Sequence, residues 1–189
     1  MTGRPVDHQR RADLLDAAVE YATEHGFSEL SWRPVAAALG VSPTTLVHHF
    51  GSKEQMLVAI LGRLRERIRA ATSDMLGEQP RLATAARVAW TRTSDPKQWP
   101  EFRLFFAVYG RALQAPREFE GFLARVVSDW MSVLVDAQGP DTDPAVAART
   151  ATLVIATIRG LLLDLLATGD RDRVQDAAES FLAGLEQLP

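Results

Sequence analysis

One short segment carries polar side chains whose spacing would place them together on a helix. At about 100° per residue, Thr44, Thr45 and His48 fall on one side of a helical wheel. Leu46 and Phe50 fall on the opposite side and are expected to pack inward. Threonine and histidine side chains can contact the edges of nucleic-acid bases. The same residue types also occur as ordinary solvated side chains, so the spacing alone leaves both interpretations open.

Two short helices joined by a tight turn are predicted to position this face. Ser31 is a candidate N-cap of the first helix, Pro34 falls in its first turn, and Gly40 fits the left-handed residue that follows it. Ser42 can cap the second helix, with Pro43 at its first position. Two helices separated by a turn that contains glycine are typical of the helix-turn-helix that binds DNA.

Several short elements occur at fixed spacing between about residue 10 and residue 57. They are Gly40-Val41-Ser42, Thr45-Leu46, His49-Phe50 and Ser52-Lys53-Glu54. Together they resemble the signature of the tetracycline-repressor (TetR) family. The resemblance implies an N-terminal three-helix DNA-binding domain, followed by a larger helical domain for ligand binding and dimerisation. Beyond residue 57 only the length and the helical character agree with the family.

The resemblance also implies which side chains meet DNA. Arg33 would read a guanine, and Lys53 would bind a phosphate. The other implied contacts come from the second helix: Pro43, Thr44, Thr45, His48 and His49. The first three of these would meet base edges, and the two histidines would contact bases or the backbone. Val47 departs from the family, which usually has a tyrosine that bonds a phosphate there, so we expect that contact to be lost or supplied elsewhere.

The composition limits the possible functions. The chain has 189 residues, of which 47% are hydrophobic and 24% are charged, as is ordinary for a soluble globular protein. It contains no cysteine, which excludes disulfides, thiolate metal sites and cysteine nucleophiles. The net charge is −3, yet residues 1–70 hold 9 Lys/Arg against 8 Asp/Glu, together with all four histidines. DNA affinity must therefore come from a few well-placed cations rather than from bulk charge.

The sequence favours a cytoplasmic protein with no membrane partner. Its N-terminus is charged and lacks the apolar core of a secretion signal. The longest apolar run, Leu153–Leu166, is expected to be too short for a membrane span, and it contains Arg159 and Asp164.

A helix is predicted from about His8 to His25, after a disordered N-terminal arm at residues 1–9. Its apolar stripe consists of Leu14, Leu15, Ala18, Val19 and Ala22. Three arginines near its start could reach phosphates or the minor groove, or remain solvated: Arg4, Arg10 and Arg11.

An all-α fold is predicted for the whole chain, because no period-2 strand pattern appears. Ser52 and Gln55 form a capping box for the next helix, and the resemblance implies that this helix links the two domains. Proline and glycine divide the remainder into helices at Arg81–Thr93, Glu101–Gln114, Arg117–Ala137, Pro144–Thr168 and Arg171–Leu188. We predict a helix-turn-helix DNA-binding domain at residues 1–52 and an effector-binding and dimerisation domain at residues 53–189.

Aromatic side chains are concentrated between residues 90 and 130. Such clusters usually form core, but in a family whose middle helices enclose a ligand they would also suit an apolar or aromatic effector. The candidate pocket consists of Trp90, Phe102, Arg103, Phe106, Tyr109, Phe122, Trp130 and Asp164. Asp164 stands alone in an apolar run and needs a partner if it is buried. That partner would be Arg159, Arg103 or Arg111, or else the ligand.

The helix predicted at Pro144–Thr168 becomes apolar on nearly all sides after Ala151, so it must be covered on every side. The simplest cover is the ligand cavity on one side and a second subunit on the other. We expect the last two helices to form a four-helix bundle with those of a partner. The candidate interface residues are Leu153, Leu161, Leu165, Phe181 and Leu185.

The motifs of common enzymes are absent, among them G-x-S-x-G, H-E-x-x-H and the glycine-rich phosphate loop, and no cofactor or metal is implied. Two alternatives remain: an all-α enzyme that uses the aromatic pocket, and a ligand-binding or dimeric module whose helix-turn-helix is only structural. Only a regulator requires binding to duplex DNA. We predict a homodimeric transcriptional regulator, a repressor that binds a palindromic DNA operator and is released by a small apolar or aromatic effector.

Overall fold

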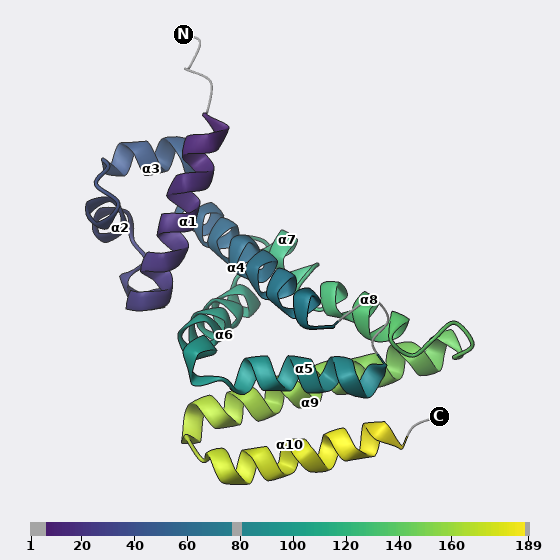
Figure 1. The fold of residues 1–189 in the computed structure, drawn as a ribbon. Helices are drawn as coiled ribbons and strands as arrows, with labels where there is room; N and C mark the ends of the chain where they lie inside the picture. Colours follow the sequence, from purple (N-terminus) through teal and green to yellow (C-terminus); the bar gives the residue numbers. More distant parts are fainter. Residues whose placement is uncertain (1–6, 77–80, 188–189) are drawn as a thin grey trace. The chain divides into compact units, whose positions relative to one another are not determined.

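The computed structural model describes residues 7–76 and 81–187 of the chain. Over these ranges every regular element is helical and no strand occurs, which confirms the predicted all-α fold (Figure 1). The α-helices are α1 (His8–His25), α2 (Trp32–Ala38), α3 (Pro43–Phe50), α4 (Lys53–Leu76), α5 (Leu82–Ser94), α6 (Trp99–Gln114), α7 (Glu120–Leu123), α8 (Ser128–Asp136), α9 (Pro144–Thr168) and α10 (Arg171–Glu186). Short 3-10 turns, η1 (Phe27–Glu29) and η2 (Pro96–Gln98), precede α2 and α6.

Most helix ends lie where capping residues predict them. The bounds of α1 and α9 agree with the prediction. The Asp7 carboxylate caps α1 by accepting the N–H of Arg10 at 3.1 Å. Gly26 follows α1 with a φ of 78°, in the left-handed region that favours glycine. Arg4 and Leu188 lie outside the described residues.

One predicted helix was wrong. The segment predicted as a single helix, Arg117–Ala137, forms α7 and α8 with turns between them. In the interruption, the carbonyl of Val126 accepts a hydrogen bond from the guanidinium of Arg159. Val126 is followed by Val127, and two successive β-branched residues weaken a helix at this point. The interruption therefore has a local cause in the two valines, and the carbonyl of Val126 is satisfied by Arg159 of α9.

The chain divides into two compact units. The first comprises Met1–Ile68 with Pro100–Leu123, and the second comprises Arg69–Trp99 with Ala124–Pro189. The division falls within α4 rather than at its start. The predicted boundary at residue 52 does not coincide with this division, and it stays a prediction.

In the first unit, α1, α2, α3 and the N-terminal part of α4 contribute to the core. The predicted apolar stripe of α1 is buried, and so are the apolar side chains that recur along α4: Met56, Leu57, Ile60, Leu61, Leu64 and Ile68. Arg67 reaches across from α4 to α1 and bonds Asp16 at 2.9 Å and Glu20 at 3.0 Å. Arg63 lies 3.3 Å from the same Asp16 carboxylate. These two arginines of α4 therefore both pair with α1.

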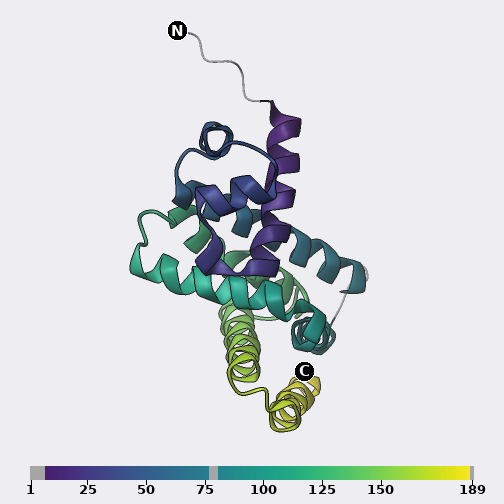
Figure 2. The same ribbon diagram turned by 90° about the vertical axis from the view of Figure 1, so that its left-hand side faces the viewer.

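In the second unit, α9 is the central helix and contacts α5, α8 and α10. It is joined to α10 by a short turn at Gly169, so that the two helices form a hairpin (Figures 1 and 2). The core that these helices share includes Trp90, Val154, Leu165, Val174 and Leu182. Arg87 of α5 also bonds two carboxylates of α10, Glu179 at 2.8 Å and Glu186 at 2.9 Å.

The length and composition of α9 alone would allow it to cross a membrane. The sequence predicted that the apolar run was too short, but the helix is 25 residues long. This is weak evidence for a membrane span, because the core helix of a soluble protein meets the same criterion. Only 22% of its most apolar stretch is buried. Much of the apolar surface of α9 is therefore not buried within this chain.

Candidate nucleic-acid interface

The start of α3 is fixed by local hydrogen bonds. Ser42 has the extended backbone of an N-cap, and its hydroxyl accepts the N–H of Thr45 at 3.1 Å. Pro43 occupies the first helical position, where its fixed φ suits the helix and its missing N–H costs nothing. Gly40 has a φ of 65° and turns the chain between α2 and α3. The structure therefore confirms the predicted helix-turn-helix geometry.

One face of α3 is anchored and the other is exposed. Leu46 is 0% exposed and Phe50 is 4% exposed, as the helical wheel predicted. Thr44 and His48 are exposed on the opposite side. Thr45 is only half-exposed, and its hydroxyl lies 2.9 Å from that of Ser42. The cap therefore engages one of the predicted base-contacting groups.

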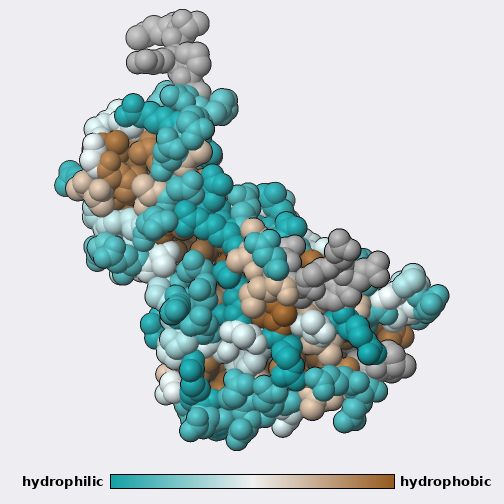
Figure 3. All heavy atoms as spheres, viewed as in Figure 1, coloured by the Kyte–Doolittle hydropathy of each residue, from teal (hydrophilic) through white to brown (hydrophobic). Residues whose placement is uncertain are grey.

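Val47, at the position where the family usually has tyrosine, is 44% exposed on α3. Apolar residues gather at the surface over this helix (Figure 3). A valine has no hydroxyl, so this side chain cannot supply a hydrogen bond to a phosphate.

Arg11 joins the end of α3 to α1, a link that the sequence did not reveal. Its Nε donates to the carbonyl of His49 at 3.1 Å, and its guanidinium lies 5.3 Å from the centre of the Phe50 ring. A cation over an aromatic face adds electrostatic attraction to the hydrogen bond. Arg11 thus helps to orient α3, whereas the sequence offered it as a phosphate contact or a solvated charge. The 38 positions between Arg11 and His49 leave no local pattern that would predict the link.

The two histidines at the end of α3 lie edge to face, with ring centres 5.3 Å apart. The Nδ1 atom of His49 is buried and has no hydrogen-bond partner among the described residues. Burial lowers the pKa of His49, and the charges of His48, Arg10 and Arg11 lower it further, while Asp7 opposes them. The imidazole of His49 is therefore held neutral in the free protein.

The start of α4 forms the predicted capping box. The N–H of Ser52 donates to Oε1 of Gln55 at 2.9 Å, and the N–H of Gln55 donates to the Ser52 hydroxyl at 3.1 Å. Gly51 has a φ of 77°, which favours glycine, and a Cβ there would lie 2.0 Å from the same Gln55 oxygen and displace it from the capping box. The box does not use the backbone N–H groups of Lys53 and Glu54. A helix N-terminus with a cation beside it is suited to an anion such as phosphate.

The predicted effector residues are divided between the two units. Phe102, Arg103, Phe106, Tyr109 and Phe122 belong to the first unit, and Trp90, Trp130 and Asp164 belong to the second. In the first unit the rings of Tyr109 and Phe122 lie 5.8 Å apart, and both neighbour Phe105, which the prediction omitted.

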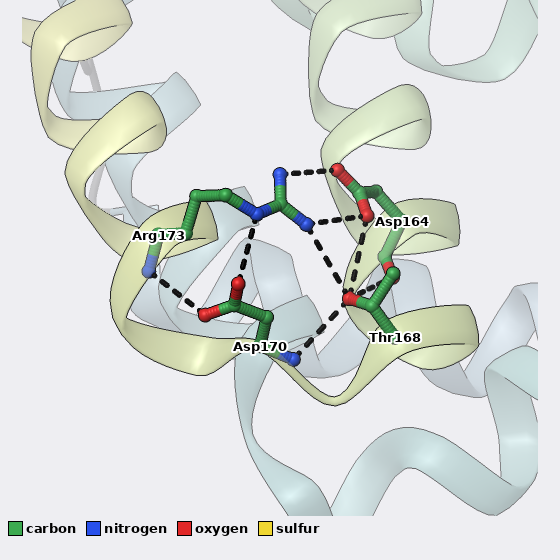
Figure 4. A network of polar contacts seen from close by, with 4 residues as sticks. All are labelled: Asp164, Thr168, Asp170 and Arg173. Carbon is green, nitrogen blue, oxygen red and sulfur yellow. Dashed lines mark hydrogen bonds and ion pairs between the residues drawn. The ribbon is translucent and has the colours of Figure 1, made fainter.

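Two members of the predicted pocket have internal partners. The indole N–H of Trp90 donates to Gln175 of α10 at 3.0 Å, and Trp90 is only 3% exposed. Asp164 forms a two-bond pair with Arg173 of α10, at 2.9 and 2.8 Å (Figure 4). Its partner is therefore none of the three arginines that the sequence suggested. Arg173 lies nine positions away, across the turn between α9 and α10, where helical spacing gives no signal.

The predicted interface residues differ in exposure. Leu153 is 58% exposed, whereas Leu161, Phe181 and Leu185 are half-buried against the core of the second unit. Leu165 is 1% exposed and belongs to that core, so it offers no surface to a partner. Leu163, which the prediction omitted, is 51% exposed.

Comparison with known proteins identifies the helix-turn-helix. Residues 14–60 match the family described as "Bacterial regulatory proteins, tetR family". The chain is 33% identical over 175 residues to the HTH-type transcriptional regulatory protein RaaS of Mycobacterium tuberculosis, which covers 86% of this chain and 74% of that protein. The chain belongs to the TetR family. It is also 30% identical over 160 residues to the HTH-type transcriptional repressor KstR of Mycolicibacterium smegmatis, covering 70% of this chain and 78% of the repressor.

The fold of the whole chain agrees with this membership. A solved transcriptional regulator of the TetR family from Cytophaga hutchinsonii superimposes with a TM-score of 0.79, covering 98% of both chains at 14% identity. At that identity the likeness shows the fold alone. TetR-family members are soluble transcriptional regulators that bind DNA and small-molecule effectors, and they are not enzymes. The protein is therefore a DNA-binding transcriptional regulator, as the sequence predicted.

The neutral state of His49 makes the first unit sensitive to acid. An unfolded histidine titrates near pH 6.5, whereas the lowered pKa of His49 means that the folded state binds its proton less readily. Between the two pKa values the unfolded chain holds more protons, so stability is complete above about pH 7 and is lost as the pH falls through the folded pKa. We expect His49→Gln to reduce this acid destabilisation, measured as the thermal unfolding of DNA-free protein between about pH 7.5 and 5. His25→Gln, an exposed control at the end of α1, should retain it. An unchanged pH slope in His49→Gln would contradict the assignment.

Proposed function

We propose that this TetR-family protein is a homodimeric repressor that binds a palindromic operator in the cytoplasm and is released by a small apolar or aromatic effector. The main support is the exposed face of α3, held in a fixed orientation by Leu46, Phe50 and Arg11. A rigid helix with small polar side chains on its outer face fits the major groove. Two such helices, related by a two-fold axis, would read a palindrome.

The proposed DNA contacts fall into two classes. Arg33 is exposed on α2 and would read guanine through its guanidinium, while Pro43, Thr44 and Thr45 would meet other base edges. Lys53 at the start of α4 would hold a phosphate, and His48 and His49 would contact bases or backbone. Base contacts carry sequence information, whereas phosphate contacts mainly set position and affinity.

Arg33→Ala and Lys53→Ala should therefore have different effects on DNA binding. We expect Arg33→Ala to cost about 1–3 kcal/mol on the operator and to relax the preference at one base pair of each half-site. Lys53→Ala should weaken binding to all sequences alike and flatten the dependence of affinity on salt. Binding-site selection followed by fluorescence anisotropy at several salt concentrations measures both effects. Lys97→Ala, which removes a cation exposed outside the proposed interface, is the control. The same sequence-independent loss in both variants would show that the two contacts are misassigned.

The homodimer proposal rests on the outer face of α9. Leu153, Ala156, Gly160, Leu163 and Ala167 recur at spacings of three and four, and all are exposed. A long exposed apolar face on a soluble regulator is typical of a surface that is buried against a partner. A second copy of the same face would supply it, in a bundle of four helices made by α9 and α10 of both chains.

Charge placed on this face should separate the subunits. We expect Leu153→Glu combined with Leu163→Glu to give folded monomers, because each dimer would have to bury four unpaired carboxylates. Sedimentation would show the dissociation, and circular dichroism would show retained helix. Leu113→Glu is the matched control, because Leu113 is 64% exposed on α6 and lies outside this face. An intact dimer of the double variant would rule out this surface.

The effector proposal is supported by the aromatic side chains predicted for the pocket. The rings of Tyr109 and Phe122 already lie together in the first unit. Trp90 has a partner in Gln175, and Asp164 has one in Arg173. Arg103, on the same helix as Tyr109, is the charged side chain that we propose to orient the effector. We propose Phe102 and Phe106 of the same unit as further apolar contacts.

An effector that releases DNA must bind the DNA-free conformation more tightly. We expect an apolar aromatic ligand identified from a screen to lose about 100-fold in affinity, equal to about 2.7 kcal/mol, when the protein is saturated with operator. Calorimetry with and without operator DNA measures this difference. Tyr109→Ala should weaken the ligand in both states, with Leu113→Ala as an exposed control on the same helix. Equal affinity in the presence and absence of operator would show that the ligand does not control DNA binding.

A further inference from the structure

The outer surface of α3 has two flanks of different chemistry. Because Leu46 and Phe50 are buried, the helical spacing of about 100° per residue fixes where the other side chains lie. One flank consists of Pro43, Thr44 and Val47. The other flank consists of Thr45, His48 and His49. The first flank therefore presents a proline ring, a threonine methyl group and the two methyl groups of a valine, and we call it the apolar flank.

The apolar flank is open to solvent. All three of its residues are exposed, Val47 to 44%, and apolar surface is visible over this helix (Figure 3). Val47 follows Pro43 by four positions and Thr44 by three, so the three side chains are neighbours on the helix surface. The side chains of Val47 and Pro43 contain no group that can donate or accept a hydrogen bond. Their favourable contacts are therefore apolar ones.

Val47 is held in position by the free protein. Its carbonyl accepts the N–H of Gly51 at 2.8 Å, which closes the last turn of α3. A β-branched side chain within a helix strongly prefers one rotamer, so the two methyl groups have little freedom. The burial of Leu46 and Phe50 fixes the rotation of the whole helix. A contact made by Val47 would thus lose little conformational entropy on binding.

The chemistry of the major groove indicates what the apolar flank can contact. The helix α3 lies within residues 14–60, the part of the chain that matches the DNA-binding family, and an α-helix fits the major groove. Base edges there present hydrogen-bond donors and acceptors, and thymine alone adds a C5-methyl group. An aliphatic side chain placed against a donor or acceptor would remove its water without replacing the hydrogen bond. Placed against the thymine methyl, it would bury apolar surface instead.

We propose that Val47 is a specificity-determining residue, which reads the C5-methyl group of a thymine in each half-site of the operator, with Pro43 and Thr44 beside it. This inference rests on the operator binding of the proposed function and adds a base contact to it. At this position a tyrosine would offer a hydroxyl to a phosphate, which carries no sequence information. The valine gives up that contact and gains one that depends on the base.

Replacement of thymine by deoxyuridine isolates the proposed contact, because it removes the methyl group and keeps every hydrogen-bonding group. Binding-site selection with the full wild-type chain supplies the duplex, and each thymine of one half-site is then replaced in turn. We expect one of these replacements to weaken binding about fourfold, which corresponds to about 0.8 kcal/mol for one methyl group removed from an apolar contact. Fluorescence anisotropy measures the dissociation constants.

Val47→Ala should remove the dependence on that methyl group. In this variant we expect the same deoxyuridine replacement to change the dissociation constant by less than about 1.5-fold, because the two partners of the contact are coupled. Val146→Ala is the matched control, since Val146 is a valine of α9 that is 40% exposed, and it should retain the fourfold loss. Val47→Thr keeps the branched shape with one methyl group fewer, and its loss should be smaller than that of wild type. Circular dichroism monitors the helix content of each variant.

The outcomes separate this inference from the proposed function. Wild-type protein that selects no duplex would overturn the proposed operator binding, and this inference with it. A selected duplex in which no thymine methyl group affects binding would overturn this inference alone. An undiminished fourfold loss in Val47→Ala would also overturn it, because another residue would then read the methyl group. Equal weakening of all duplexes by Val47→Ala would do the same, because it would assign Val47 to the DNA backbone.

Discussion

The burial of Leu46 and Phe50 is the constraint on which the proposed recognition surface depends. Because these two side chains are almost fully enclosed, α3 cannot rotate about its axis without exposing them. Ser42 fixes where the helix begins, and Arg11 holds its far end to α1. The outer side chains are therefore presented by a rigid support, and recognition does not have to order the helix first.

The second unit is organised around α9, which contacts α5, α8 and α10 and still keeps an exposed side. Its inner side and α10 enclose Trp90, whose indole is bonded to Gln175. Gln175 in turn bonds Glu179, the carboxylate that Arg87 holds from α5. One side of α10 is thus tied to α5 by polar contacts, while Arg173 of α10 bonds Asp164 of α9. This arrangement separates the internal packing of the unit from the surface proposed for the second copy.

Local signals in the sequence predicted much of the fold. Ser42, Pro43 and the capping box of Ser52 with Gln55 act within four residues, so their roles follow from chemistry and spacing. Contacts between distant segments could not be predicted in this way. Arg11 with His49, and Trp90 with Gln175, depend on how helices pack, and no periodicity encodes that. The same limit explains why Leu165 was predicted in the interface although it lies in the core. A leucine looks the same in the sequence in either place.

Val47 places an apolar group on the outer face of α3, at a position where the resemblance to the TetR family leads us to expect a tyrosine. Affinity for DNA of any sequence rests largely on contacts to phosphates, and on the proposed interface few residues make them. With the contacts proposed above, the protein would dwell only briefly at any one non-operator position. It would search the chromosome mainly by repeated release and three-dimensional diffusion, with short slides between encounters. The occupancy of an operator would then follow the number of free protein molecules more closely than the amount of surrounding DNA.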